Sequence, residues 1–215
     1  MRIGSMNKTT VVIKTLGRKT LKNAVESSRR EGFTTLVISD GADINIEELG
    51  DIEYVQLGKK WGYYGGMAAN VGAALVKTEF ITFLDDDDEF VPGAGDIIRK
   101  KLEEKPEVDV WVGGVRFCSP ISVRDMKTGV EQLSSRDLAM SSDLGVVPGN
   151  VAMPTYRTSI FSKLPFMDSV PPHQLNLTDF IHIHSCKNVG YTVDWFGGPI
   201  YLVRPGTSTL NGRGV

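Results

Sequence analysis

The chain has 215 residues and a mass of 23.6 kDa, with 24 basic and 26 acidic side chains and a formal charge of −2. Its length suits a single domain, and its 41% apolar and 23% charged residues exclude a disordered or fibrous chain. A charge near zero gives no overall attraction to nucleic acid or to an anionic membrane. Cys118 and Cys186 lie far apart without a CxxC motif, which argues against a disulfide framework or a structural zinc site.

No apolar run reaches the roughly 18–20 residues that span a bilayer, and the N-terminus lacks the apolar core of a signal peptide. Residues 1–10 instead read as a tag remnant or leader, because Gly4-Ser5 precedes a second methionine, Met6. We therefore expect a cytoplasmic protein without a membrane span.

The first half of the chain alternates between strand-like and helix-like hydrophobic patterns. Leu21, Ala24 and Val25 share one helical face, and Gly32 follows where a helix C-cap belongs. The predicted order is a strand over 11–16, a helix over 18–31, strands over 34–39 and 52–57, a helix over 66–77, a strand over 79–84, a helix over 92–105 and a strand over 108–117. This order predicts an α/β domain with a mostly parallel central sheet and helices on both faces.

The second half is less regular. Residues 118–176 are rich in Ser, Pro and Gly, which predicts loops, hairpins and short helices. A helix is predicted over 178–187, and short strands over 191–196 and 200–203. Trp111 and Trp195 stand in strand-like contexts and are expected in the core.

Five consecutive carboxylates, residues 85–89, follow the fourth predicted strand. Neighbouring like charges raise one another's pKa unless a cation is present. In an extended segment, Asp85 and Asp87 would point to one side and Asp86 and Asp88 to the other. Paired carboxylates suit Mg²⁺ or Mn²⁺ together with substrate phosphates. A solvated acidic loop is the alternative, but the carboxyl end of a buried strand is where such sheets bind ligands, which favours the metal.

The acidic run with its preceding strand resembles the FLDxDD segment of the family 2 glycosyltransferases, which have the GT-A fold. Residues 65–72 are similar to that family's G-x-x-A-R-N-x-G helix. Asp40 ends the second strand where the family has D-D-G-S, and Thr178-Asp179 stands where the family has its E-D pair. The matches keep the family's order across residues 11–196.

The resemblance implies a nucleoside-diphosphate sugar as donor. Asp87 would coordinate a Mn²⁺ or Mg²⁺ ion at the donor diphosphate, Asp85 would contact the ribose or sugar, and Asp86 would assist at the sugar. Further nucleotide-sugar contacts are implied for Thr15, Arg18, Asp40 and Asn70. The alternatives are a solvated Arg18, an Asx turn at Asp40 and a structural Asn70.

The same resemblance makes Asp179 the general base that deprotonates the acceptor hydroxyl and so inverts the anomeric configuration. Its alternative role is that of an acidic residue favoured by a helix N-terminus. Thr178 replaces the family's Glu. His182 and His184 are two residues apart and do not share a helical face, so we expect them to be structural.

Several positions are left unassigned by the resemblance. Ala69 stands where the family has Arg, so the donor contact there is open. A basic and aromatic loop is the candidate replacement, with no single residue assigned among Lys59, Lys60, Trp61 and Tyr64. A cation in the polar tail, Arg204 or Arg213, is implied as part of a lid over the diphosphate, but a frayed terminus is the favoured interpretation of residues 207–215.

The combined expectation is a metal-dependent, inverting glycosyltransferase of the hexosyltransferase kind that uses a UDP-sugar by preference. We expect addition of a single sugar, because the Q-x-x-R-W motif and the membrane helices of the family's processive synthases are absent. Residues 11–117 would bind the nucleotide-sugar, and residues 118–215 would form the acceptor-binding half and tail of the same domain.

Two other functions compete with this one. A sugar-nucleotide pyrophosphorylase-like nucleotidyltransferase would carry a G-x-G-x-R signature, which residues 15–19 lack. A non-catalytic module that binds a nucleotide-sugar or glycan would lose the base, but Asp179 is present. The acceptor is unknown; nucleic acid is not favoured, yet it stays among the candidates. The chain is short for the family, so acceptor selection would need a homo-oligomer, a partner protein or a large exposed acceptor.

Overall fold

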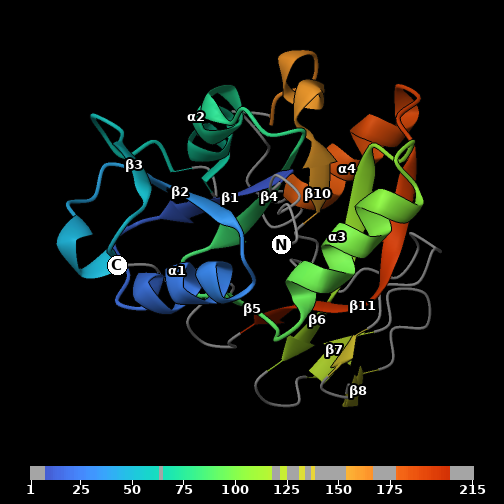
Figure 1. The fold of residues 1–215 in the computed structure, drawn as a ribbon, viewed down its shortest axis with the longest axis horizontal. Helices are drawn as coiled ribbons and strands as arrows, with labels where there is room; N and C mark the ends of the chain where they lie inside the picture. Colours follow the sequence, from blue (N-terminus) through green and yellow to red (C-terminus); the bar gives the residue numbers. More distant parts are fainter. Residues whose placement is uncertain are drawn as a thin grey trace, which may run out of the picture.

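The computed structural model describes residues 8–62, 65–117, 122–124, 131–133, 137–138, 154–166 and 178–203 (Figure 1). Its strands are β1 (Thr9–Thr15), β2 (Thr34–Ser39), β3 (Glu53–Gln56), β4 (Phe80–Asp85), β5 (Glu89–Phe90), β6 (Val110–Phe117), β7 (Ser122–Arg124), β8 (Glu131–Leu133), β9 (Asp137–Leu138), β10 (Thr155–Arg157) and β11 (Val193–Val203). Its helices are α1 (Leu21–Arg30), α2 (Gly66–Leu75), α3 (Ala94–Glu104) and α4 (Thr178–Asn188), with short 3₁₀ helices η1 (Ile46–Leu49) and η3 (Thr158–Ser162).

One large sheet contains most of these strands in the order β3-β2-β1-β4-β10-β6-β11-β5, with β9 beside β6. The pairs β3–β2, β2–β1, β1–β4 and β6–β11 are parallel, while β10 runs antiparallel between β4 and β6. In this register Thr15 lies opposite Ser39, and Lys14 lies opposite Asp85. The carboxyl ends of β1, β2 and β4 therefore meet at one edge of the sheet.

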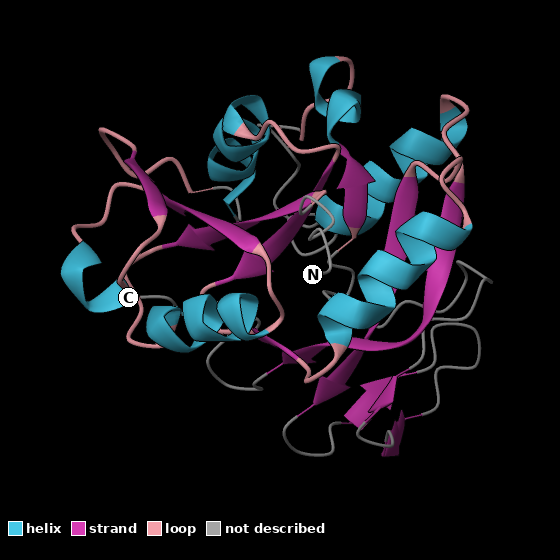
Figure 2. Cartoon of the chain, in the orientation of Figure 1, coloured by secondary structure: helices cyan, strands magenta, loops and turns pink. Residues whose placement is uncertain are grey.

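Helices cover both faces of the sheet (Figure 2). Because side chains alternate along a strand, Val11 and Ile13 of β1 pack with α1 and α3, whereas Val12 packs with α2, η3 and α4. The second face also carries an aromatic group in which Phe83 contacts Tyr156, Phe161 and Phe166 edge to face. The predicted α/β fold with a mostly parallel sheet and helices on both faces is confirmed.

Most predicted elements lie within a few residues of the observed ones, and β2 has the predicted bounds. The two predicted strands at 191–196 and 200–203 are one strand, β11, whose register against β6 shifts on either side of Pro199. The strands β5 and β10 were not predicted, because two or three residues are too few for a periodic pattern. Trp111 is buried and stacks on Phe196, and Trp195 is half-buried.

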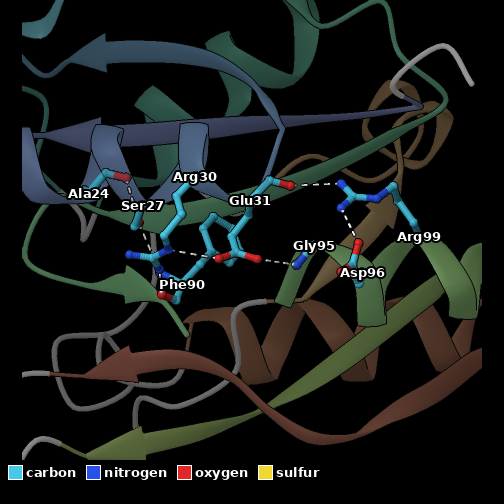
Figure 3. A network of polar contacts seen from close by, with 8 residues as sticks. All are labelled: Ala24, Ser27, Arg30, Glu31, Phe90, Gly95, Asp96 and Arg99. Atoms are coloured by element: carbon cyan, nitrogen blue, oxygen red, sulfur yellow. Dashed lines mark hydrogen bonds and ion pairs between the residues drawn. The ribbon is translucent and has the colours of Figure 1, made fainter. Parts of the chain in front are cut away.

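The short strand β5 is held to helix α1 by side chains of that helix (Figure 3). The Phe90 N–H donates to Ser27 Oγ at 3.1 Å, and the Phe90 carbonyl accepts from Arg30 Nη2 at 2.5 Å. The Phe90 ring packs on Phe33 and Tyr201, with centroids 5.1 and 5.2 Å away. Strand β5 is thus fixed both by α1 and by its pairing with β11.

The end of α1 is joined to the start of α3 by the buried Glu31 (Figure 3). Glu31 Oε2 accepts the Gly95 N–H at 3.0 Å, and Oε1 accepts from Arg30 Nε at 3.0 Å. The Glu31 carbonyl accepts from Arg99 Nη1 at 2.9 Å. A carboxylate at the first turn of α3 satisfies a free N–H and interacts favourably with the helix dipole.

We expect Gly95→Ala to lower the free energy of unfolding by about 1–3 kcal/mol, because the new Cβ would lie 2.3 Å from the Glu31 carbonyl oxygen. This loss would run against helix propensity, which favours alanine over glycine. Urea denaturation measures it. The control is Gly58→Ala, whose Cβ would meet nothing within 4 Å and which should change stability by less than about 0.5 kcal/mol. Equal effects for the two variants would contradict the packing described for α1 and α3.

Candidate functional site

The acidic run forms a tight turn between β4 and β5. The Asp88 N–H donates to the Asp85 carbonyl at 3.1 Å, and the chain re-enters the sheet at Glu89. Asp85 and Asp87 come together as expected, but the expected pairing of Asp88 with Asp86 is wrong, because the turn ends the strand at Asp85. Oxygens of Asp85, Asp87 and Asp88 all lie within 4.8 Å of one another, and Asp86 is not part of this group.

Asp86 instead holds the loop between β1 and α1. It is fully buried, and its Oδ2 accepts from Thr15 Oγ1 at 2.6 Å and from the Leu16 N–H at 3.0 Å. Its Oδ1 accepts from the Arg18 guanidinium. Thr15 Oγ1 in turn accepts the Gly17 N–H at 2.9 Å. Both oxygens of Asp86 are thus engaged by the protein, and its contact to a nucleotide-sugar stays a prediction.

Arg18 links Asp86 to the group formed by Asp85, Asp87 and Asp88. Its Nη1 lies 3.7 Å from Asp87 Oδ1. Burial of Asp87 raises its pKa to about 6, helped by the charge on Asp85 and opposed by Arg18. Asp87 Oδ2 is buried and has no hydrogen-bond partner among the described residues. A buried oxygen without a donor, beside two further carboxylates, fits a hard divalent cation such as Mg²⁺ or Mn²⁺.

Lys14 is a site residue that the sequence analysis missed. Its Nζ lies 2.9 Å from Asp85 Oδ1, and its side chain is only 11% exposed beneath Gly65 at the start of α2. Burial alone would lower the pKa of Lys14, but Asp85 and Asp179 outweigh it and raise the pKa, so the ammonium stays charged. The available signal was that Lys14 is the one charged residue of β1, because a buried cation needs a partner.

Asp179, in the first turn of α4, lies in the electrostatic field of Lys14 and Asp85. Burial raises its pKa to about 6, while Lys14 lowers it and Asp85 raises it further. The fold therefore brings a carboxylate from the second half of the chain to the ends of β1 and β4. A pKa just below neutrality suits a group that accepts a proton at physiological pH.

Asp40 holds the loop that follows β3. Its two oxygens accept the N–H groups of Trp61 and Gly62, each at 2.8 Å. Gly41 packs against the same loop, since a Cβ there would lie 2.3 Å from the Lys60 nitrogen. The turn at the end of β2 and the loop after β3 thus form one unit at the same edge of the sheet as the acidic turn.

Asn70 and His182 contact the segment that follows η3. Asn70 donates to the Phe166 carbonyl at 3.0 Å and accepts the Phe166 N–H at 2.8 Å, which is a structural pairing. His182 lies 2.9 Å from the Leu164 carbonyl and against the Phe166 ring at 4.3 Å, and burial lowers its pKa. His182 therefore has the structural role expected.

Four predicted positions are not placed. Tyr64, Arg204 and Arg213 lie outside the described residues, and so does the side chain of Thr178.

Comparison with known proteins agrees with this fold. The profile of glycosyl transferase family 2 matches residues 10–164, so the chain belongs to that family. The crystal structure of S. aureus TarS 1–349 matches with a TM-score of 0.65 and 15% identity, over 92% of this chain and 60% of that one. The complex of TarS 1–349 with UDP-GlcNAc matches with a TM-score of 0.64 and 13% identity, over 97% and 61%. At these identities the likeness establishes a shared GT-A fold.

The chain spans about 60% of TarS 1–349 and 36% of the longer TarS structure, which matches with a TM-score of 0.63 and 15% identity over 92% of this chain. A search of curated protein sequences found no significant match. Within the described part of the chain, no helix has the length and apolar character needed to cross a membrane.

Asp86→Asn should lower the free energy of unfolding by about 2 kcal/mol, because Arg18 loses its buried partner. Fully buried pairs lose about 3–5 kcal/mol, but Arg18 is 26% exposed and water compensates in part. Denaturation in urea tests this, with Glu26→Gln as control. Glu26 pairs with Lys22 on the exposed face of α1, where the expected loss is about 0.5 kcal/mol or less. If Asp86→Asn lost no more stability than the control, Asp86 would not be the residue that holds the β1–α1 loop.

Proposed function

We propose that the chain is a metal-dependent glycosyltransferase that moves one sugar from a nucleoside-diphosphate sugar to an acceptor hydroxyl in the cytoplasm. The observation that carries the proposal is the convergence of Asp85, Asp87 and Asp88, with a buried oxygen of Asp87 that has no hydrogen-bond partner among the described residues. Membership of family 2 supports the transferase class. TarS structures with UDP and with UDP-GlcNAc support a UDP-sugar as the donor.

The divalent ion, Mn²⁺ or Mg²⁺, would be held by Asp87 with Asp85 and Asp88 beside it. Its chemistry would be to neutralise the diphosphate as that group leaves the sugar. Lys14 already balances the charge of Asp85, which leaves Asp87 as the carboxylate with the strongest need for a cation. Arg18 lies beside Asp87 and adds positive charge on the side of the β1–α1 loop.

Asp179 would accept the proton of the acceptor hydroxyl. As that proton leaves, the hydroxyl oxygen bonds to the anomeric carbon, and the bond from that carbon to the diphosphate oxygen breaks. Attack from the face opposite the diphosphate inverts the anomeric configuration. Lys14 favours the ionised form of Asp179 that this step requires.

The other predicted site residues would act mainly by placing backbone and loops around the nucleotide. Thr15 and Asp40 each hold a loop at the carboxyl edge of the sheet, and Asn70 fixes the Phe166 segment to α2. We further propose that residues 11–117 bind the donor and residues 118–215 bind the acceptor. The two halves share one sheet, because β10 lies between β4 and β6, and β6 pairs with β11.

A nucleotide should stabilise the protein only together with the metal. We expect one of UDP, GDP, CDP and dTDP, with Mn²⁺, to raise the melting temperature, since a ligand at about 100 times its Kd adds about 2.7 kcal/mol. Asp87→Asn should abolish the metal-dependent part, and the exposed Asp51→Asn should not. The shift should weaken below pH 6, where protons compete for Asp87. No shift with any of the four nucleotides would contradict the proposal.

The rate at saturating Mn²⁺ should rise with pH through about 6 as Asp179 loses its proton. Asp179→Asn should abolish sugar transfer, measured as release of nucleoside diphosphate, and leave donor affinity within about threefold, because the base acts on the acceptor.

Lys14→Met provides the matched test of that pH profile. Removal of a cation near Asp179 disfavours the carboxylate, raises its pKa and moves the acidic limb to higher pH. The largest influences on the pKa of Asp87 are instead its burial, Asp85 and Arg18. A limb that stays in place would assign it to a group other than Asp179.

A further inference from the structure

Lys14 and Asp85 form an ion pair on the face of the sheet that carries α2 and α4. They are register partners in the parallel pair β1–β4, and they continue the alternation of Val12 and Phe83, whose side chains pack on that face. Lys14 Nζ lies 2.9 Å from Asp85 Oδ1. The charge of Asp179, in the first turn of α4, also acts on Lys14.

The side chain of Lys14 has little room to leave this position. It is only 11% exposed, whereas the side chain of Asp85 is 43% exposed. Its stem runs beneath Gly65, where an added Cβ would lie 3.1 Å from Lys14 Cδ, and α2 begins at the next residue. A buried ammonium that loses its close partner is costly, so the fold holds Lys14 against Asp85.

This ion pair opposes the use of Asp85 as a metal ligand. Oxygens of Asp85, Asp87 and Asp88 lie within 4.8 Å of one another, so an ion held by Asp87 would also be near Asp85. Such an ion competes with Lys14 for the negative charge of Asp85. The ammonium and the metal also repel each other, because both are positive.

Asp87 is not committed in this way. Its Oδ2 is buried and has no hydrogen-bond partner among the described residues, while its Oδ1 lies 3.7 Å from Arg18 Nη1. The protein thus offers an uncommitted oxygen at Asp87 and a committed one at Asp85. Mg²⁺ and related ions are commonly held by one or two carboxylates together with substrate phosphates, which would supply the negative charge that Asp85 withholds.

We propose that Lys14 is a positioning residue that commits Asp85 to the ion pair and so keeps the affinity of the protein alone for a divalent ion low. The ion then binds tightly only together with the phosphates of the donor. This inference rests on the proposed function and deepens it, because it states what limits metal binding at the same site. It also predicts that removal of a buried lysine strengthens metal binding.

Titration of the protein with Mn²⁺ alone, without nucleotide, tests the proposal. The electron paramagnetic resonance signal of free Mn²⁺ gives the Kd at neutral pH. Lys14→Met should lower this Kd on the order of tenfold, because Asp85 becomes available and a nearby positive charge is lost. Lys14→Gln, which keeps a polar group beside Asp85, takes its place if a thermal melt shows that Lys14→Met does not fold.

The matched control is Lys8→Met. Lys8 Nζ lies 3.9 Å from Glu79 Oε2 at the amino ends of the same two strands, roughly 20 Å from Lys14. This variant removes the same charge from the protein, but salt screens it over that distance. The Kd of Mn²⁺ should therefore stay within about twofold of the wild type.

Asp85→Asn shows whether Lys14 acts through Asp85. Alone, it should weaken Mn²⁺ binding by no more than about threefold, since Asp85 is already committed, whereas Asp87→Asn should abolish binding. In the double variant Lys14→Met/Asp85→Asn, most of the tenfold gain should disappear, because the two residues act as a pair.

Two results would overturn this inference and leave the proposed function standing. One is a Lys14→Met protein that binds Mn²⁺ no more tightly than the wild type, and the other is an equal gain with and without Asp85. Failure of the wild type to bind Mn²⁺ both alone and together with UDP, GDP, CDP or dTDP would overturn the proposed function as well.

Discussion

The arrangement of the site depends on one buried carboxylate, Asp86. It joins the end of β4 to the β1–α1 loop through Thr15 and Arg18, and α1 then holds the other side of the turn through the backbone of Phe90. The same helix and its leading loop therefore fix the acidic turn on both sides. Asp86 is turned into the protein, and oxygens of Asp85, Asp87 and Asp88 lie within 4.8 Å of one another.

Two cations, Lys14 and Arg18, balance the negative charge of these carboxylates from opposite sides. Lys14 lies on the side of α2 and α4, beside Asp85 and Asp179, and Arg18 lies on the side of α1, beside Asp87. Burial and the charge on Asp85 keep the pKa of Asp87 raised even next to the Arg18 guanidinium. Charges held in place by the fold are suited to the electrostatic stabilisation of a leaving group.

The fold and the general position of the site could be predicted from the sequence, because both follow from local patterns and from motifs read in order. The contacts that the side chains make inside the site could not be predicted. Identical aspartates give no sign of which one turns inward, since that depends on Thr15, 71 positions away. The partners of Asp40 and Asn70 are backbone groups of irregular loops, which carry no periodic signal. Lys14 could have been found, because it is the one charged residue of β1 and a buried cation requires a counter-charge.

The closed turn between β4 and β5 also limits the insertions that this part of the chain can accept. Surface loops usually tolerate insertions, because lengthening a flexible loop costs little entropy. Here an added residue would break the bond between Asp88 and Asp85, or pull Phe90 away from Ser27 and Arg30. We therefore expect the length of this turn to be restricted more tightly than that of an ordinary surface loop.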